Sequence, residues 1–112
     1  MWTDSEGRDW STAININTVR QVNEMIGVRL TDAADSDLIE RLYSDVLLLC
    51  DVLYAVCREQ ANTRDVTAAA FGEFLAGDVI DSACESLMQS IADFFPRGRR
   101  EGVVKIWTAA KR

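Results

Sequence analysis

Residues 38–60 read LIERLYSDVLLLCDVLYAVCREQ, and their apolar side chains recur at helical spacing along the whole stretch. In the part Val46–Val56 these side chains cover nearly the full circumference of a helix, with Asp51 as the interruption. A helix coated in this way packs on several sides, so we expect it to be the central helix of the fold. Ser44 and Asp45 mark a point where it divides into a short helix and a long one.

The residues before this central helix predict a strand. Residues 10–16 alternate between apolar or β-branched side chains and small polar ones, which is the pattern of a half-buried strand. Residues 1–9 are expected to be flexible, although Gly7 allows them to turn back as a short hairpin. Because one strand is not stable alone, it must pair with these residues, with a second copy or with a partner.

Helix-start and helix-stop residues divide the rest of the chain. Gly27 and Gly77 are placed as C-terminal stops, while Thr67 and Asp78 are placed as N-terminal caps. The predicted helices outside the central one span residues 18–27 (capped by Asn17 or Thr18), 67–77, 78–95 and, more weakly, 97–110. Pro96 ends the longest of them. Residues 97–112 are therefore expected to be a basic C-terminal tail or helix.

Together these elements predict one domain over residues 1–112. The expected fold is mainly α, a compact bundle of about five or six helices with one short N-terminal strand or hairpin. Five apolar residues of the two longest helices are expected in its core: Leu47, Leu53, Val56, Leu87 and Ile91.

The charge of the chain is unevenly distributed. The net charge is −6 over 112 residues, but residues 97–112 carry six basic side chains against one Glu. Residues 1–96 carry six basic side chains against seventeen carboxylates, an excess that repels nucleic acid. We expect the basic tail to lie across the acidic body, with a phosphate or an acidic partner as the alternative.

The sequence contains few signs of catalysis. It has no His, no glycine-rich phosphate loop and no nucleophile motif, and it predicts no metal site, no cofactor and no catalytic residue. The three cysteines, Cys50, Cys57 and Cys84, lack metal-ligand spacing, and we interpret them as small core residues. With a polar N-terminus and no membrane-length apolar run, the chain is expected in a cytoplasm. An enzyme that relies on carboxylates alone stays the least favoured alternative.

The order of elements resembles that of a known family. A strand, a helix ending in Gly, an apolar helix, a Thr-capped short helix and a longer helix follow one another over about residues 7–96. This order, with the segments DVLYAV (51–56) and FGEFLAGD (71–78), resembles the small tail assembly chaperones of long-tailed bacteriophages. Residues 97–112 match nothing in that pattern.

The resemblance implies a function without catalysis. Members of this family act in the host cytoplasm, where they bind the tape measure protein, keep it soluble and help to recruit tail tube subunits. It therefore implies a non-enzymatic binder of amphipathic helices, with the tape measure protein and the tail tube protein as partners. The alternative is a small structural virion component or an inhibitor-type protein-binding module.

A binding site for such a partner is expected between the two longest helices. An amphipathic helix would lie in an apolar groove walled by residues 38–57 and 79–95. The candidate partner-binding residues at its rim are Tyr43, Tyr54, Met88 and Phe94. We also expect homo-oligomers, because repeated weak contacts favour coating of a rod-like partner. An apolar groove predicts only a mild dependence on salt.

Overall fold

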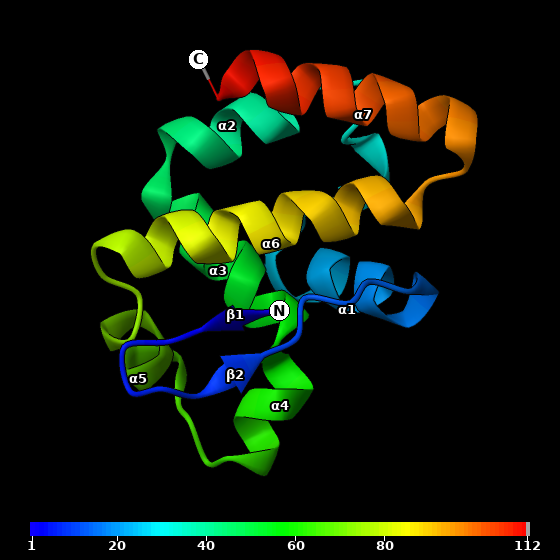
Figure 1. Cartoon of the computed structure of the whole chain (residues 1–112). Coiled ribbons are helices and arrows are strands. Elements are labelled where there is room, and N and C mark those ends of the chain that lie inside the picture. Colours follow the sequence, from blue (N-terminus) through cyan, green and yellow to red (C-terminus); the bar gives the residue numbers. More distant parts are fainter. Residues whose placement is uncertain (112) are drawn as a thin grey trace.

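The computed structural model describes residues 1–111 and is a mainly helical bundle with an N-terminal hairpin (Figure 1). The elements in chain order are β1 (Trp2–Thr3), β2 (Asp9–Trp10), α1 (Ile16–Ile26), the 3-10 helix η1 (Leu30–Asp32), α2 (Leu38–Ser44), α3 (Val46–Val56), α4 (Arg58–Thr63), α5 (Ala68–Glu73), α6 (Asp78–Phe94) and α7 (Arg97–Ala110). This confirms the predicted fold class.

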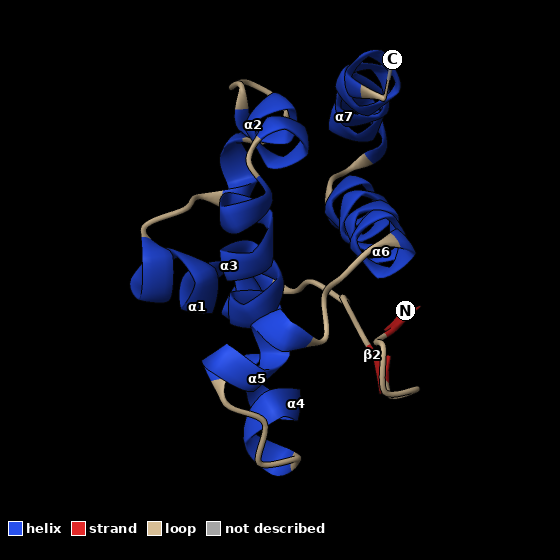
Figure 2. Ribbon diagram, turned by 90° about the vertical axis from the view of Figure 1, so that its left-hand side faces the viewer, coloured by secondary structure: helices blue, strands red, loops and turns tan. Residues whose placement is uncertain are grey.

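The elements form three layers. Figure 2 shows α2 and α3 as a central column, with α4 and α5 at its lower end. Helix α1 packs on one side of α3, whereas α6, α7 and the hairpin lie on the other side. Helix α7 bridges α6 and α2, so the basic C-terminal segment is part of the bundle and covers its upper end.

The central stretch divides twice. Asp45 is extended (φ −126°, ψ 97°), and its carboxylate accepts hydrogen bonds from the backbone N–H groups of Leu47 and Leu48, both at 3.1 Å. These bonds satisfy donors that the start of α3 leaves free, so the predicted break is confirmed. A second break at Cys57 separates α3 from α4. The described residues therefore contain seven α-helices, more than the five or six expected.

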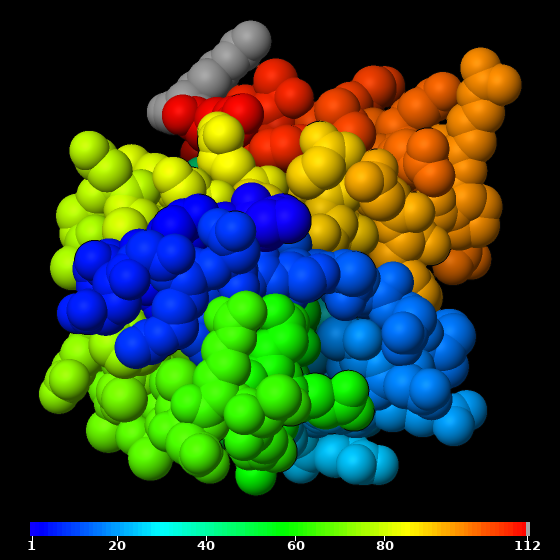
Figure 3. All heavy atoms as spheres, turned by 60° about the horizontal axis from the view of Figure 1, so that its bottom comes forward, coloured from blue at the N-terminus to red at the C-terminus, as the bar shows by residue number. Residues whose placement is uncertain are grey.

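The N-terminal residues form the short hairpin that the sequence allowed. Trp2 pairs with Trp10 and Thr3 with Asp9, and Gly7 makes the turn with a positive φ of 81°. The two indoles are buried and stack with their centroids 5.9 Å apart. Figure 3 shows this segment lying across the surface of the body, between α6 and α4. The large apolar area of two Trp side chains accounts for the order of such a short hairpin.

The predicted strand over residues 10–16 has the expected burial pattern only as far as Ile14, since Ile16 is exposed, and its extent is wrong. Trp10 and Thr12 point inward and Ser11 outward, yet the strand ends at Trp10. The backbone of Ser11 bonds instead with the side-chain amide of Gln60, with N–H and C=O contacts of 2.8 and 2.9 Å. The Thr12 hydroxyl lies 2.7 Å from the hydroxyl of Ser86 on α6. After Trp10, side chains of α4 and α6 therefore make the hydrogen bonds that a paired strand would make.

The helix ends agree with the sequence at some positions and differ at others. Thr67 caps α5, and Gly27 ends α1 with a φ of 68°, both as predicted. Helix α1 begins earlier than expected because its N-terminal cap is Asn15, and not Asn17 or Thr18. The Asn15 side chain accepts a hydrogen bond from the backbone N–H of Thr18. Gly77 does not close α5, which ends at Glu73; it precedes α6 with a φ of 58° and takes the capping position predicted for Asp78.

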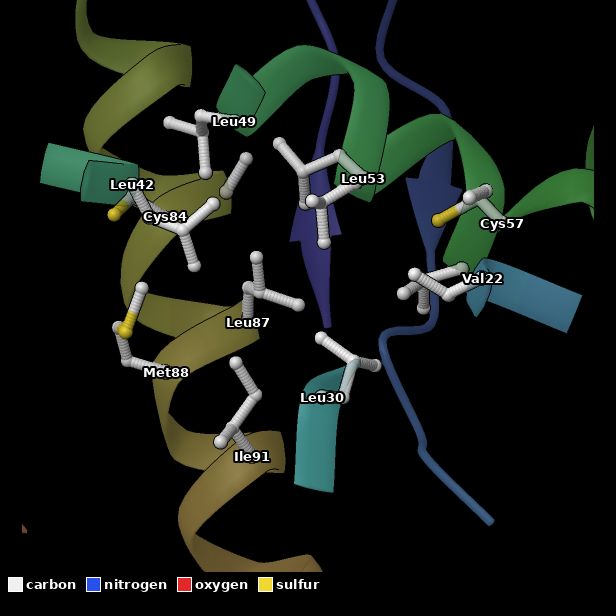
Figure 4. Close-up of a cluster of buried hydrophobic side chains, with 14 of the residues drawn as sticks. Val22, Leu30, Leu42, Leu49, Leu53, Cys57, Cys84, Leu87, Met88 and Ile91 are labelled. Atoms are coloured by element: carbon white, nitrogen blue, oxygen red, sulfur yellow. The ribbon is translucent and has the colours of Figure 1, made fainter. Parts of the chain in front are cut away.

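The core lies between α3 and α6, with contributions from the layers on both sides (Figure 4). Leu53, Val56, Leu87 and Ile91 are buried as predicted. Leu47 is not, since 74% of its surface is exposed. Because Asp45 starts a new helix, Leu47 lies in the first turn of α3, and the core does not cover it. None of the helices within residues 1–111 is both long and apolar enough to cross a bilayer.

Candidate partner-binding groove

An apolar groove lies where the first half of α3 meets α5 and the start of α6. Its volume is about 300 Å³. Val46 and Leu47, exposed over 52% and 74% of their surface, lie at its mouth, and the buried residues Leu49 and Leu53 form its floor. The lining residues are Val46, Leu47, Leu49, Cys50, Leu53, Gly72, Leu75 and Ile80. Four of these belong to the first two turns of α3.

The groove follows from the local sequence. Helix α3 carries apolar side chains around most of its circumference, and the core covers only part of that surface. The break at Asp45 leaves its first turn without a preceding helical turn on the same axis. Helix α5 has only six residues and contributes a bare backbone at Gly72 beside Leu75. The apolar side of α3 is therefore left open at this end.

Of the three cysteines, Cys50 is the one that lines the groove. It is half-buried, and both burial and the neighbouring Asp51 carboxylate raise its pKa. Cys57 and Cys84 lie in the core, where burial raises the pKa of the first to about 12 and of the second to about 11. All three thiols are free, and their raised pKa values favour the protonated form near neutral pH, which suits the packing role inferred from the sequence.

Met88 was predicted at the rim of the groove, but it does not lie there. It is fully buried, and Figure 4 shows it among the core side chains beside Leu87 and Ile91. Helix α6 packs against α3 on one side, and α2 and α7 cover a second side. Met88 is therefore enclosed within the core and is not open to a partner.

The other three predicted residues are partly exposed, but they do not line the groove. Tyr43 accepts a hydrogen bond from the Trp107 indole N–H at 2.7 Å, which ties α2 to α7. Burial raises the pKa of the Tyr43 hydroxyl to about 12. Tyr54 packs edge-on against Phe71 with centroids 5.3 Å apart, below the hairpin. Phe94 packs against Phe95 near the far end of α6.

The groove therefore lies partly between the predicted walls, and none of the four predicted residues lines it. The groove does lie between residues 38–57 and 79–95, but α5 forms its third side. The signal that points to Val46 and Leu47 is present in the sequence. An Asp cap at residue 45 places both in a first turn, on a helix with more apolar surface than one core can cover.

The carboxylates are spread over the surface. Asp51 is exposed, as are Asp37, Asp78 and Asp81 near helix starts and Glu59, Glu73 and Glu85 on outer faces. Among residues 1–111 there is no group of three or more Asp, Glu, Cys or His side chains placed to hold a metal ion. Just beyond α7, Lys111 pairs with Glu85 at 3.1 Å, so the C-terminal segment makes an ionic contact with α6.

Comparison with known proteins adds no assignment. No family model matches the sequence, and no curated protein or solved structure is significantly similar to it.

Proposed function

We propose that this protein is a non-enzymatic binding protein that holds an amphipathic helix of a partner in the groove between α3, α5 and α6. The observation that carries this proposal is the exposure of Val46 and Leu47 at the mouth of an apolar groove whose floor is the core itself. Adjacent exposed apolar side chains beside a concave apolar surface are typical of interaction sites. A helix with anchors at i, i+3, i+4 and i+7 has a matching apolar stripe.

The biological setting that we propose is phage tail assembly in the host cytoplasm. There the protein would bind the tape measure protein, keep it soluble and help to recruit tail tube subunits. Support for this setting comes from the resemblance in element order and from an apolar groove suited to the long helices of a rod-like partner. A small virion component or an inhibitor-type module would use the same groove on a different partner.

Co-expression with the tape measure protein of the same genome tests this function. The wild-type protein should keep the tape measure protein in the soluble fraction, and Leu47→Gln should lower that fraction several-fold. Leu47 is mostly exposed, so this change should leave the fold intact. Ile16→Gln is the matched control, because Ile16 is an exposed apolar residue at the start of α1, outside the groove.

Alkylation of Cys50 reports occupancy of the groove directly. A neutral reagent at mildly alkaline pH should modify Cys50 before the buried Cys57 and Cys84, and the bound partner should slow that modification. Mass spectrometry identifies the modified residue. If the tape measure protein stays insoluble beside folded wild-type protein, the chaperone function is wrong. Recovery of this protein in purified particles would then favour a virion component.

A further inference from the structure

We propose that the groove is specific for a basic amphipathic helix, one whose apolar anchors are flanked by Lys and Arg. This inference rests on the proposed function and deepens it, because it names the chemistry of the partner segment. It is carried by the charged residues that lie next to the lining residues in the sequence, all of which are acidic.

Five carboxylates stand next to the lining residues. Asp45, Asp51, Glu73, Asp78 and Asp81 each lie within two positions of a lining residue, and no Lys or Arg does. All five are exposed. In the part of the chain that the structure describes, the ion pairs involve other carboxylates, and none of these five is paired.

Part of this charge is compensated locally. Asp45, Asp78 and Asp81 lie at the starts of α3 and α6, where the helix ends carry partial positive charge. Asp51 lies in the middle of α3 and Glu73 at the last residue of α5, so neither has that compensation. The negative charge of Asp51 reaches into the groove, since it contributes to the raised pKa of Cys50. The rim is therefore negative overall.

A second copy of this chain fits the groove poorly. Pairing of two such grooves face to face would bring two sets of five carboxylates together, which like-charge repulsion opposes. The basic helix α7 has the right charge, but its apolar side chains face α2 and α6, and Val104 is its one large apolar residue among those strongly exposed. A separate helix with several apolar anchors and basic flanks satisfies both the apolar floor and the acidic rim.

The acidic rim also changes the expected effect of salt. From the sequence the apolar groove predicted mild salt dependence, whereas exposed pairs between Lys or Arg and these carboxylates weaken as ions screen them. An exposed ion pair changes an affinity by a factor of about 1.5 to 5, so three together give on the order of tenfold. The affinity for a basic helix should fall by a similar factor between about 0.05 M and about 0.5 M salt.

Two synthetic peptides test the preference. Both carry Leu at i, i+3, i+4 and i+7 and have matched helicity; one is flanked by Lys and Arg and the other by Glu. Binding of the labelled peptides to the full chain is measured by fluorescence anisotropy at low and high salt. The basic peptide should bind on the order of tenfold more tightly at low salt, and the difference should shrink at high salt.

Three variants locate the effect. The first combines Asp51→Asn, Glu73→Gln and Asp81→Asn, and it should weaken binding of the basic peptide on the order of tenfold and strengthen binding of the acidic peptide. Asp45 is left unchanged because its carboxylate caps α3. The matched control, Glu24→Gln with Asp35→Asn and Glu59→Gln, removes the same charge from exposed positions outside the groove and should have little effect. Leu47→Gln should weaken both peptides.

The outcomes separate this inference from the proposed function. Equal binding of both peptides, weakened by Leu47→Gln, would overturn the preference for basic helices and leave the groove as a binding site. Binding of neither peptide, or binding that Leu47→Gln does not change, would overturn both. Dissociation of a dimer by Leu47→Gln, with the peptide competing against that dimer, would assign the groove to a second copy and overturn the inference.

Discussion

Asp4 organises the N-terminal hairpin from a buried position. Its Oδ1 accepts from the backbone N–H groups of Glu6 and Arg8, at 2.8 and 3.0 Å. Its Oδ2 accepts from the Trp10 indole at 2.8 Å and lies 3.5 Å from the Arg8 guanidinium. Burial alone raises the pKa of Asp4, but these hydrogen bonds and the charge of Arg8 outweigh it and lower the pKa below its usual value.

Asp4→Asn should therefore destabilise the fold in a pH-dependent way. An amide oxygen replaces only one of the two acceptors, so we expect a loss of about 1–3 kcal/mol at neutral pH. Because the folded pKa is lowered, this stabilisation is present above the ordinary pKa of about 4 and is lost as the pH falls through the folded pKa. Urea unfolding of wild type and variant at neutral and acidic pH measures the difference, with exposed Asp9→Asn as control. If wild type and Asp4→Asn differed by the same free energy of unfolding at acidic and at neutral pH, the stabilising role of the Asp4 carboxylate would be contradicted.

At the scale of one element, helix α3 has a core side and an open side. Leu53 is fully buried at the contact with the core, whereas Leu47, six residues earlier, is mostly exposed. Both are Leu in the same helix, so neither residue type nor helix propensity distinguishes them. The difference lies in what covers each side chain.

Substitution of the two leucines should therefore change the free energy of unfolding by very different amounts. Leu53→Ala should lower the free energy of unfolding by about 2–5 kcal/mol, and Leu53→Asp should unfold the domain. Leu47→Ala should change it by less than about 0.5 kcal/mol. Urea unfolding followed by circular dichroism checks both. A cooperatively melting Leu53→Asp variant would show that the core is misplaced.

Over the whole molecule, the basic C-terminal segment packs against the acidic body. Trp107 bonds to Tyr43 and Lys111 to Glu85, so α7 holds its place, and Arg97, Arg99 and Lys105 face outward. Exposed basic side chains are thus concentrated on α7, while the rest of the chain carries an excess of carboxylates. Such a distribution favours head-to-tail contacts between copies, which can extend into open arrays along a rod-shaped partner.

We therefore expect homo-oligomers, dimers or larger, that dissociate at high salt. Light scattering over a range of protein and salt concentrations measures this. Replacing Arg97, Arg99 and Lys105 together by Gln should reduce the association, and Leu47→Gln should not, because the groove is not the contact. A strict monomer at high concentration and low salt would count against the coating role.

The sequence by itself determined the features that depend on neighbouring residues. Local hydrogen bonding and helical periodicity account for the break at Asp45, the Thr67 cap, the Gly27 stop and the burial of Leu53, Val56, Leu87 and Ile91. The inward alternation of residues 10–12 is likewise a local pattern. These signals are contained within a few residues, and the tertiary fold leaves them unchanged.

Tertiary packing alone decided the rest. Whether residues 1–9 are ordered depended on the stacking of Trp2 and Trp10 against Phe71, a contact between residues far apart in the chain. Whether Met88 or Leu47 is open depended on how the helices pack, because periodicity shows which residues share a side of a helix and not what covers that side. The groove is the apolar surface left when the neighbouring helices are too few and too short to cover α3.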